Sequence, residues 1–208
     1  MDLKLRDKNA LVCGSTQGIG KATAILLAQE GANVTLLARN EEKLTAVLNE
    51  LPNSNQKHNY LVADFSKPEE LKKVLLSSDL QFHILVNNTG GPAGGPIFNA
   101  KIGEFEKAFT QHLKCNHILV QTLAPFMKTQ CFGRIINVIS TSVKQPLDGL
   151  GVSNTIRGAV ASWSKTMANE LGEFGITVNN VLPGATNTER LLEIITNKAN
   201  KTGLTVDK

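Results

Sequence analysis

Six short apolar runs, separated by longer amphipathic segments, most constrain what this chain of 208 residues can fold into. The runs occupy residues 10–14, 33–38, 59–63, 82–87, 134–140 and 176–182. Runs that are apolar on both faces are typical of strands buried in a parallel sheet, and right-handed crossovers then place helices on both sides. The pattern predicts an α/β fold, a Rossmann-type doubly wound parallel sheet in three layers, as a single domain over residues 1–208.

The segments between the runs predict the helices and one irregular loop. Helices are expected over residues 18–30, 41–51, 68–77, 101–128, 151–173 and 188–201. Residues 90–96 read GGPAGGP, which is too rich in glycine and proline for a helix or a strand. This loop is expected to form a lip at the end of the fourth strand.

Composition excludes several classes of partner. The net charge is +4, but lysine and arginine are scattered rather than gathered beside aromatic residues, so no nucleic acid is expected. No apolar run approaches the roughly 18 residues of a membrane span, so we expect no membrane segment and a cytoplasmic protein. Cys13, Cys115 and Cys131 lack metal-ligand spacing, so no metal is expected, and their apolar or helical contexts predict reduced, buried thiols.

A glycine-rich turn follows the first predicted strand directly. It comprises Gly14, Ser15, Thr16, Gln17, Gly18, Ile19 and Gly20, and a helical pattern begins within it. A pyrophosphate must approach the backbone and the positive end of the helix, and glycine leaves that approach open. The strand before and the helix after this turn favour a dinucleotide site over a plain tight turn.

The spacing Gly-x-x-x-Gly-x-Gly resembles that of the short-chain dehydrogenase/reductase family, and further motifs follow in the family's order. Asp64 matches the residue that contacts adenine. Asn87-Asn88-Thr89-Gly90 is similar to the family's Asn-Asn-Ala-Gly signature, with threonine for alanine. The resemblance therefore implies that Asn88 and Gly90 contribute to the cofactor site.

The second half of the chain carries the resemblance further. Ser140 stands at the family's serine position, and Pro183, Gly184 and Thr188 match the segment that holds the nicotinamide carboxamide. Among subfamilies the sequence is most similar to the 3-oxoacyl-[acyl-carrier-protein] reductases. The family continues past Thr188 into more helix and a last strand, whereas this chain ends at Lys208. The sixth strand is therefore expected at an edge, in a chain that is either naturally short or given incompletely.

Arg39, at the end of the second predicted strand, bears on the form of the cofactor. An acidic residue there would accept from the ribose hydroxyls of NAD, whereas the guanidinium suits the 2′-phosphate of NADP. No acidic residue stands at the end of this strand before Glu41, so NADP(H) is favoured over NAD(H). The alternative is that Arg39 is a solvated surface residue, because Gln17 replaces the basic residue that many NADP-binding relatives carry in the turn.

The resemblance implies a catalytic tetrad of serine, tyrosine, lysine and asparagine, of which only Ser140 is intact. Ser153 stands at the tyrosine position, Arg157 at the lysine position and His112 at the asparagine position. Asn116 is a possible substitute for the asparagine. Arg157 has too high a pKa to pass a proton on, but it could still donate to the nicotinamide ribose.

No other phenol can replace the missing one, because the only tyrosine, Tyr60, is predicted on the adenine side. His112 is either a substitute acid that titrates near neutral pH or a packed helix residue. Lys144 and Asp148 are either functional or ordinary loop charges.

Two functions remain open on this sequence. The first is an NADP(H)-dependent oxidoreductase acting on a small carbonyl or alcohol, or on an acyl thioester, with a degenerate tetrad. The second is a weakly active or inactive NADP(H)-binding sensor or partner protein.

The helices over residues 101–128 and 151–173 predict a homodimer or homotetramer. The second helix carries an apolar stripe that is either an interface or core, formed by Val152, Ile156, Ala159, Val160, Trp163 and Met167.

Overall fold

A six-stranded parallel sheet forms the centre of the molecule, for which the computed structural model describes residues 2–203 and only some side chains of the last helix. Its strands are β1 (Asn9–Cys13), β2 (Asn33–Ala38), β3 (Asn59–Val62), β4 (Ile84–Asn87), β5 (Gly133–Val138) and β6 (Ile176–Val181). They lie in the order β3-β2-β1-β4-β5-β6 and every neighbouring pair is parallel. The predicted doubly wound sheet is confirmed.

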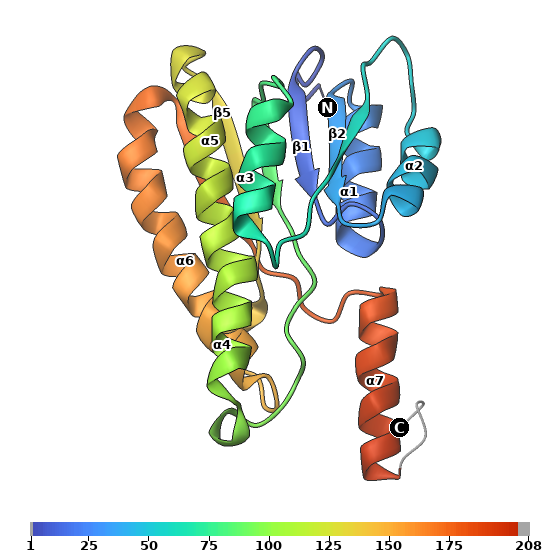
Figure 1. Cartoon of the computed structure of the whole chain (residues 1–208), viewed down its shortest axis with the longest axis vertical. Helices are drawn as coiled ribbons and strands as arrows, with labels where there is room; N and C mark the ends of the chain where they lie inside the picture. Colours follow the sequence, from blue (N-terminus) through green and yellow to red (C-terminus); the bar gives the residue numbers. More distant parts are fainter. Residues whose placement is uncertain (1, 204–208) are drawn as a thin grey trace.

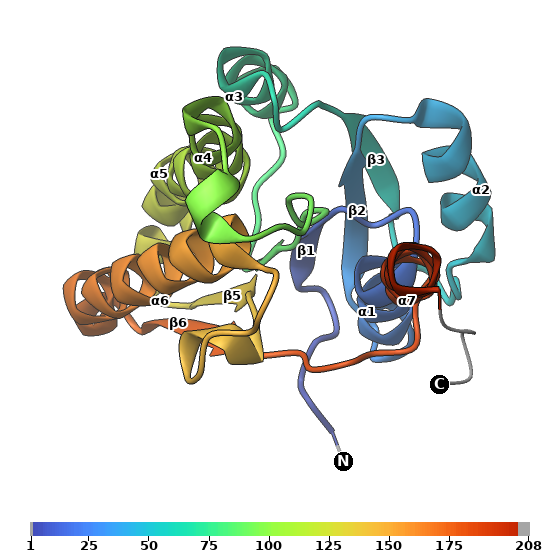
Figure 2. The same ribbon diagram turned by 90° about the horizontal axis from the view of Figure 1, so that it is seen from below.

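Helices cover the sheet from both sides, as Figures 1 and 2 show. On one side lie α1 (Gly18–Gln29) and α2 (Glu41–Glu50). On the other side lie α3 (Pro68–Ser77), α4 (Ile102–Phe109), α5 (Cys115–Thr129) and α6 (Gly151–Leu171). The last helix, α7 (Glu189–Thr202), extends beyond the sheet at the end where the strands finish.

Side chains of each central strand enter two separate cores. In β1, Leu11 and Cys13 pack into the core beneath α3, α5 and α6, whereas Ala10 and Val12 pack into the core beneath α1 and α2. All four are fully buried. A strand covered on both sides must be apolar at successive positions, which is why the sequence shows continuous apolar runs.

A π-helical turn interrupts the helix that was expected over residues 101–128. Thr110–Lys114 forms this turn between α4 and α5, with His112 at its centre. A π-turn inserts an extra residue into the helix, and such turns are frequent at functional sites. The ends of this helical segment agree with the prediction to within one residue. The 3.6-residue periodicity of the sequence does not reveal the insertion, so the sequence did not predict how it changes the direction of the side chains around His112.

The sixth strand has only one neighbour among residues 2–203, as expected for an edge strand. Its Ile176 and Val178 are buried on the α6 side, while Thr177 and Asn179 are exposed on the opposite side. Figure 2 shows no α-helix of the described chain beneath this end of the sheet. No helix in the described part is long and apolar enough to cross a membrane.

One prediction about burial was wrong in part, and one open alternative is answered in part. Cys131 is exposed, because it lies in the turn after α5 with a φ of 48° rather than in a packed element. The apolar stripe on α6 is divided: Val152, Ile156 and Val160 are buried in the core, whereas the other half of the stripe is only partly buried. The stripe therefore supplies less free surface for an interface than its sequence suggests.

Candidate functional site

A cleft of about 860 Å³ runs along the carboxyl ends of the strands, where doubly wound folds bind their ligands. The segments that follow all six strands contribute residues to its lining. Of the predicted site residues, the following line the cleft: Gly14, Thr16, Gln17, Gly18, Ile19, Arg39, Asp64, Asn88, Gly90, Ser140, Ser153, Arg157, Pro183, Gly184 and Thr188.

Three predicted residues lie behind the cleft rather than on its surface: Ser15, Gly20 and His112. The Ser15 hydroxyl is buried and accepts a hydrogen bond from the Leu37 backbone N–H at 3.1 Å. A Cβ on Gly20 would collide with the carbonyl oxygen of Gly14. Ser15 and Gly20 therefore shape the turn from inside without facing a ligand.

The glycine-rich turn is tied to the loop after β4. The Asn88 side-chain amide donates to the carbonyl oxygens of Cys13 and Gly14, both at 3.2 Å. Gly14 has a φ of 57°, and a Cβ there would lie 2.6 Å from the Asn88 carbonyl oxygen. Only glycine fits this position, because both the backbone conformation and the contact exclude a side chain.

The N-terminus of α1 opens directly onto the cleft. Gln17 precedes the helix without a side-chain cap, and the first turn contains no acidic residue. The first backbone N–H groups of a helix lack intrahelical partners and carry the positive end of its dipole. This end of the cleft therefore suits an anion such as a pyrophosphate.

Two cationic side chains line the far end of the cleft, Arg39 after β2 and Lys43 in the first turn of α2. Asn40 caps that helix, because its side-chain oxygen accepts from the Lys43 backbone N–H at 2.8 Å. The nearby Glu41 carboxylate accepts from the Tyr60 hydroxyl at 2.9 Å and does not line the cleft. This end of the cleft is consequently positive.

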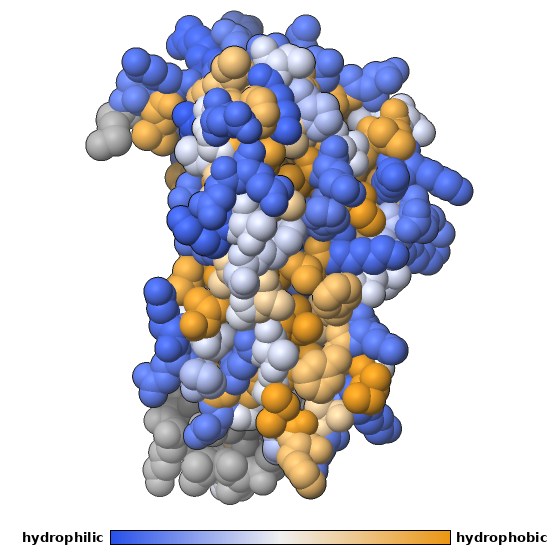
Figure 3. Space-filling model, turned by 90° about the vertical axis from the view of Figure 1, so that its left-hand side faces the viewer, coloured by the Kyte–Doolittle hydropathy of each residue, from blue (hydrophilic) through white to orange (hydrophobic). Residues whose placement is uncertain are grey.

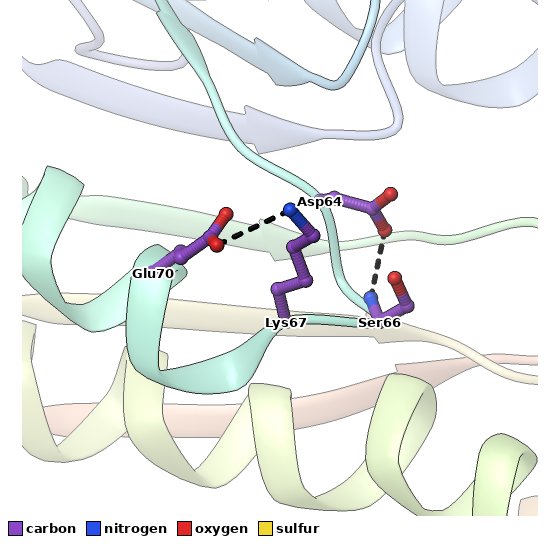
Figure 4. Close-up of polar contacts among 4 residues, drawn as sticks. All are labelled: Asp64, Ser66, Lys67 and Glu70. Carbon is purple, nitrogen blue, oxygen red and sulfur yellow. Dashed lines mark hydrogen bonds and ion pairs between the residues drawn. The ribbon is translucent and has the colours of Figure 1, made fainter.

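Asp64 lies beside these cations, after β3 (Figure 4). Its carboxylate accepts from the Ser66 backbone N–H at 2.8 Å, and this bond, together with the charges of Arg39 and Lys67, lowers the pKa of Asp64. Lys67 itself forms an ion pair with Glu70 at 3.2 Å. Asp64 is therefore an ionised acceptor at neutral pH.

The inner end of the cleft brings Ser140, Ser153 and Arg157 together. Ser140 begins the short turn after β5, and its hydroxyl oxygen accepts from the Ser142 backbone N–H at 3.1 Å. Arg157 donates from Nη1 to the Val138 carbonyl oxygen at 2.9 Å. Burial lowers the pKa of Arg157 to about 10, so it remains a cation at neutral pH.

His112 lies behind this end and is only 1% exposed. Its Nδ1 is 2.6 Å from the Thr89 hydroxyl, while its Nε2 has no hydrogen-bond partner within the described chain. Burial, with the charge of Arg157 adding to it, lowers the pKa of His112 to about 3. Of the two alternatives for His112, the burial favours the packed helix residue over the substitute acid, and the imidazole is neutral at neutral pH.

The remaining polar candidates lie outside the cleft lining. Asn116 is buried in α5, and Lys144 and Asp148 are exposed loop residues. Within residues 2–203, no group of three or more histidine, cysteine or acidic side chains is arranged to hold a metal ion.

Sequence reasoning missed several polar residues that line the cleft, among them Lys43, Thr89 and Arg190. The sequence shows Thr89 as a departure from the Asn-Asn-Ala-Gly signature, but it does not predict which residue the threonine hydroxyl contacts. Lys43 lies four residues after Arg39. Whether this spacing brings the two side chains together depends on the conformation of the intervening turn, which the sequence does not give. Arg190 of α7 donates to the Pro92 carbonyl oxygen at 3.0 Å, which joins α7 to the loop of residues 90–96.

With this fold and cleft, the chain matches a known class of proteins. Residues 8–199 match the short chain dehydrogenase family, and the chain belongs to that family.

Individual relatives narrow the comparison. The chain is 33% identical over 184 residues to the 3-oxoacyl-[acyl-carrier-protein] reductase of Staphylococcus epidermidis, covering 86% of this chain and 75% of the relative. It is 33% identical over 178 residues to the L-xylulose reductase of Caenorhabditis elegans, covering 85% and 71%. The crystal structure of L-sorbose reductase from Gluconobacter frateurii, complexed with NADPH and L-sorbose, matches with a TM-score of 0.90 at 28% identity, covering 98% and 79%.

The low pKa of His112 predicts a specific dependence of stability on pH. The folded pKa is about 3 and the ordinary value is 6.5, so between these values the unfolded chain binds a proton that the folded protein excludes. Relative to His112→Asn, the wild type should therefore lose stability as the pH falls below 6.5, by at most about 1.4 kcal/mol per pH unit. Denaturant unfolding of both proteins at pH 7 and pH 5 measures the difference. Equal pH dependence in the two proteins would contradict the buried, neutral imidazole.

Proposed function

We propose that this protein is an NADP(H)-dependent oxidoreductase of the 3-oxoacyl-reductase-like kind with a degenerate catalytic tetrad. Its substrate would be a small carbonyl or alcohol, or an acyl thioester. One observation carries the proposal: a continuous cleft joins an anion-binding helix end, a cationic far end and a serine-lined inner end. The named activities of the relatives, which reduce sugars or 3-oxoacyl thioesters, support the substrate class.

The residues present fit a dinucleotide. The uncapped N-terminus of α1 would hold the pyrophosphate, and Asp64 would accept from the adenine. A Cβ at Gly90 or Gly184 would meet nothing within 4 Å, so a ligand can approach the backbone at both positions. Thr188 and Pro183, which line the same end, would hold the carboxamide.

The cationic far end supports NADP(H) over NAD(H). Arg39 and Lys43 both line this end, and a 2′-phosphate would accept charge-assisted hydrogen bonds from them. Glu41, which could otherwise repel that phosphate, is held by the Tyr60 hydroxyl outside the cleft lining. Two cations therefore face this end, and the acid beside them is Asp64, to which the adenine is assigned.

Replacing Arg39 by alanine should weaken NADPH binding by roughly 10- to 100-fold, because a hydrogen bond to a charged group contributes about 1.5–3 kcal/mol. NADH has no 2′-phosphate, so its affinity should change little. Calorimetry with both cofactors measures the effect, and Arg6→Ala, an exposed arginine outside the cleft lining, is the matched control. Equal wild-type affinities for the two cofactors would remove the argument.

The inner end supports binding better than proton transfer. When bound, the nicotinamide supplies or accepts a hydride, and the protein must polarise the substrate oxygen and provide its proton. Ser140 can polarise the oxygen, and Arg157 can donate to the nicotinamide ribose. Ser153 cannot replace a phenol, because an aliphatic hydroxyl is a far weaker acid, and His112 is neutral and lies behind the cleft. This arrangement also favours the second candidate, a weakly active NADP(H)-binding sensor or partner protein.

Turnover should be slow compared with a relative that has the complete tetrad. General acid catalysis contributes about 10²- to 10⁴-fold in rate, so a deficit of this size is expected with NADPH and acetoacetyl-coenzyme A or L-sorbose. The double change Ser153→Tyr and Arg157→Lys should raise kcat, and His112→Asn should add to it. Ser162→Tyr, at an exposed serine of α6, is the control. Fast turnover by the wild type would show that another proton donor operates.

We also propose that the protein forms a homodimer or homotetramer through α4, α5 and α6. Apolar side chains gather in the lower half of the face shown in Figure 3. Phe98 is 96% exposed and Ile102 74%, and Ile97 and Phe109 are also exposed. Exposed apolar patches of this kind mark association surfaces. Because half of the α6 stripe is buried in the core, this patch is the stronger support for an interface.

A charge introduced into this patch should dissociate the oligomer. Ile102→Glu is expected to give a monomer in light scattering at tens of micromolar protein, because a carboxylate cannot be buried unpaired in an apolar contact. Leu76→Glu, at an exposed leucine of α3, should leave the assembly unchanged. A monomeric wild type under the same conditions would end the proposal.

A further inference from the structure

Two hydroxyl groups face the cleft from adjacent strand ends. Thr89 follows β4 and Ser140 follows β5, and both line the cleft. The two strands are parallel neighbours, with Asn87 opposite Asn137. Adjacent strands lie about 4.8 Å apart, so the segments that continue from them border the same part of the cleft.

The Ser140 hydroxyl is already arranged as a donor. Its oxygen accepts from the Ser142 backbone N–H at 3.1 Å, and its own proton has no acceptor among residues 2–203. That proton is available to an oxygen atom in the cleft. The question is whether the Thr89 hydroxyl is arranged in the same way, which depends on its contact with His112.

The tautomer of His112 decides the direction of that contact. If Nε2 carried the proton, a buried N–H without a partner would lie close to the cationic Arg157. If Nδ1 carries it, Nε2 presents only a lone pair, which a nearby positive charge stabilises. Unpaired buried N–H groups are also rarer than unpaired acceptors. The environment therefore favours the Nδ1–H tautomer.

With Nδ1 protonated, His112 donates to the Thr89 oxygen across the 2.6 Å contact. Thr89 makes no other side-chain hydrogen bond within the described residues, so its hydroxyl proton is free to point into the cleft. Thr89 and Ser140 then have the same arrangement. In each, a protein N–H donates to the hydroxyl oxygen, and the hydroxyl proton is left to donate to a ligand.

We propose that Thr89 is a substrate-binding residue whose hydroxyl, together with that of Ser140, donates a hydrogen bond to the carbonyl oxygen of the substrate. His112 is the positioning residue for Thr89. This inference rests on the proposed oxidoreductase function and adds a second donor to its substrate site. Two preorganised donors stabilise the negative charge that develops on the oxygen during reduction.

The contact of Thr89 with His112, near Arg157, connects three departures from the family pattern. Threonine replaces alanine at position 89, histidine replaces asparagine at position 112, and arginine replaces lysine at position 157. The first two are in direct contact, and Arg157 lies close enough for its charge to act on His112. The hydroxyl pair polarises the carbonyl without supplying an acidic proton, in agreement with the slow turnover expected above.

Binding in a complex that cannot react tests the proposal without requiring turnover. Calorimetry measures acetoacetyl-coenzyme A, and separately L-sorbose, added to the protein saturated with NADP⁺. Thr89→Val removes the hydroxyl at nearly constant shape and should weaken binding of the carbonyl probe by about three- to tenfold, the effect of one neutral hydrogen bond. Thr89→Ser should restore it to within about twofold, because the donor is retained. NADP⁺ affinity should stay the same in both variants.

The controls separate this contact from a general change in the cleft. Thr141→Val alters an exposed threonine next to Ser140 and should have no effect. His112→Leu, which removes the ring N–H donor, should weaken probe binding as Thr89→Val does, and the two changes together should cost no more than either alone, because they interrupt one contact. Weaker NADP⁺ binding in Thr89→Val, with probe binding unchanged, would place the hydroxyl on the cofactor and overturn the proposal. A wild-type complex that binds neither probe would overturn it as well.

The imidazole can be observed independently of any ligand. Nitrogen-15 spectra of the ligand-free protein should show a protonated Nδ1 and an unprotonated Nε2 in His112, with the Nδ1–H resonance displaced in Thr89→Val. A proton on Nε2 would overturn the inference even if the protein binds NADP⁺. Conversely, failure to bind NADP⁺ with the expected tautomer in place would reject the proposed function and leave the Thr89–His112 contact intact.

Discussion

The close approach of the glycine-rich turn to the loop after β4 is the contact on which the rest of the cleft depends. Gly14 can hold its positive φ and lie against the Asn88 carbonyl only because it has no side chain, and the Asn88 amide fixes the turn from the other side. β1 and β4 are neighbours at the point where the strand order changes direction. The loops that follow diverge from this point and open a crevice, so one steric constraint sets the position of the anion site and of the substrate end.

The architecture was predictable because its signal is local. Leu11 and Val12 are consecutive and enter different cores, which requires an unbroken apolar run and identifies a doubly covered strand. The turn from Gly14 to Gly20 was recognisable by its glycine spacing between a predicted strand and a predicted helix. Its division into residues that face the cleft and residues behind it was not, because Ser15 and Thr16 differ only in the direction of their side chains. Direction follows from contacts with distant segments, such as Ser15 with Leu37.

Predictions that assumed an average environment were the ones the structure corrected. The substitute-acid alternative for His112 used the ordinary imidazole pKa, but a π-turn places this side chain in an enclosure where protonation is disfavoured. Cys131 was assigned to the interior from its neighbours in sequence, yet it lies in an exposed turn. The helical stripe of α6 could not show which of its residues α4 covers, and Val152 and Ile156 pack against Ala108 of that helix.

The inner end of the cleft separates two tasks that a tyrosine and lysine pair would perform together. Arg157 keeps a buried positive charge where it can hold a ligand, and a single backbone carbonyl is its acceptor within the described chain. A buried cation with one neutral acceptor is costly, and an electron-rich ligand offsets part of that cost when it enters. Burial lowers the pKa of the neighbouring imidazole, and the charge of Arg157 adds to this effect, so His112 stays neutral rather than acting as an acid. The proposed combination of ligand binding with slow proton transfer rests on this burial and on the charge that it encloses.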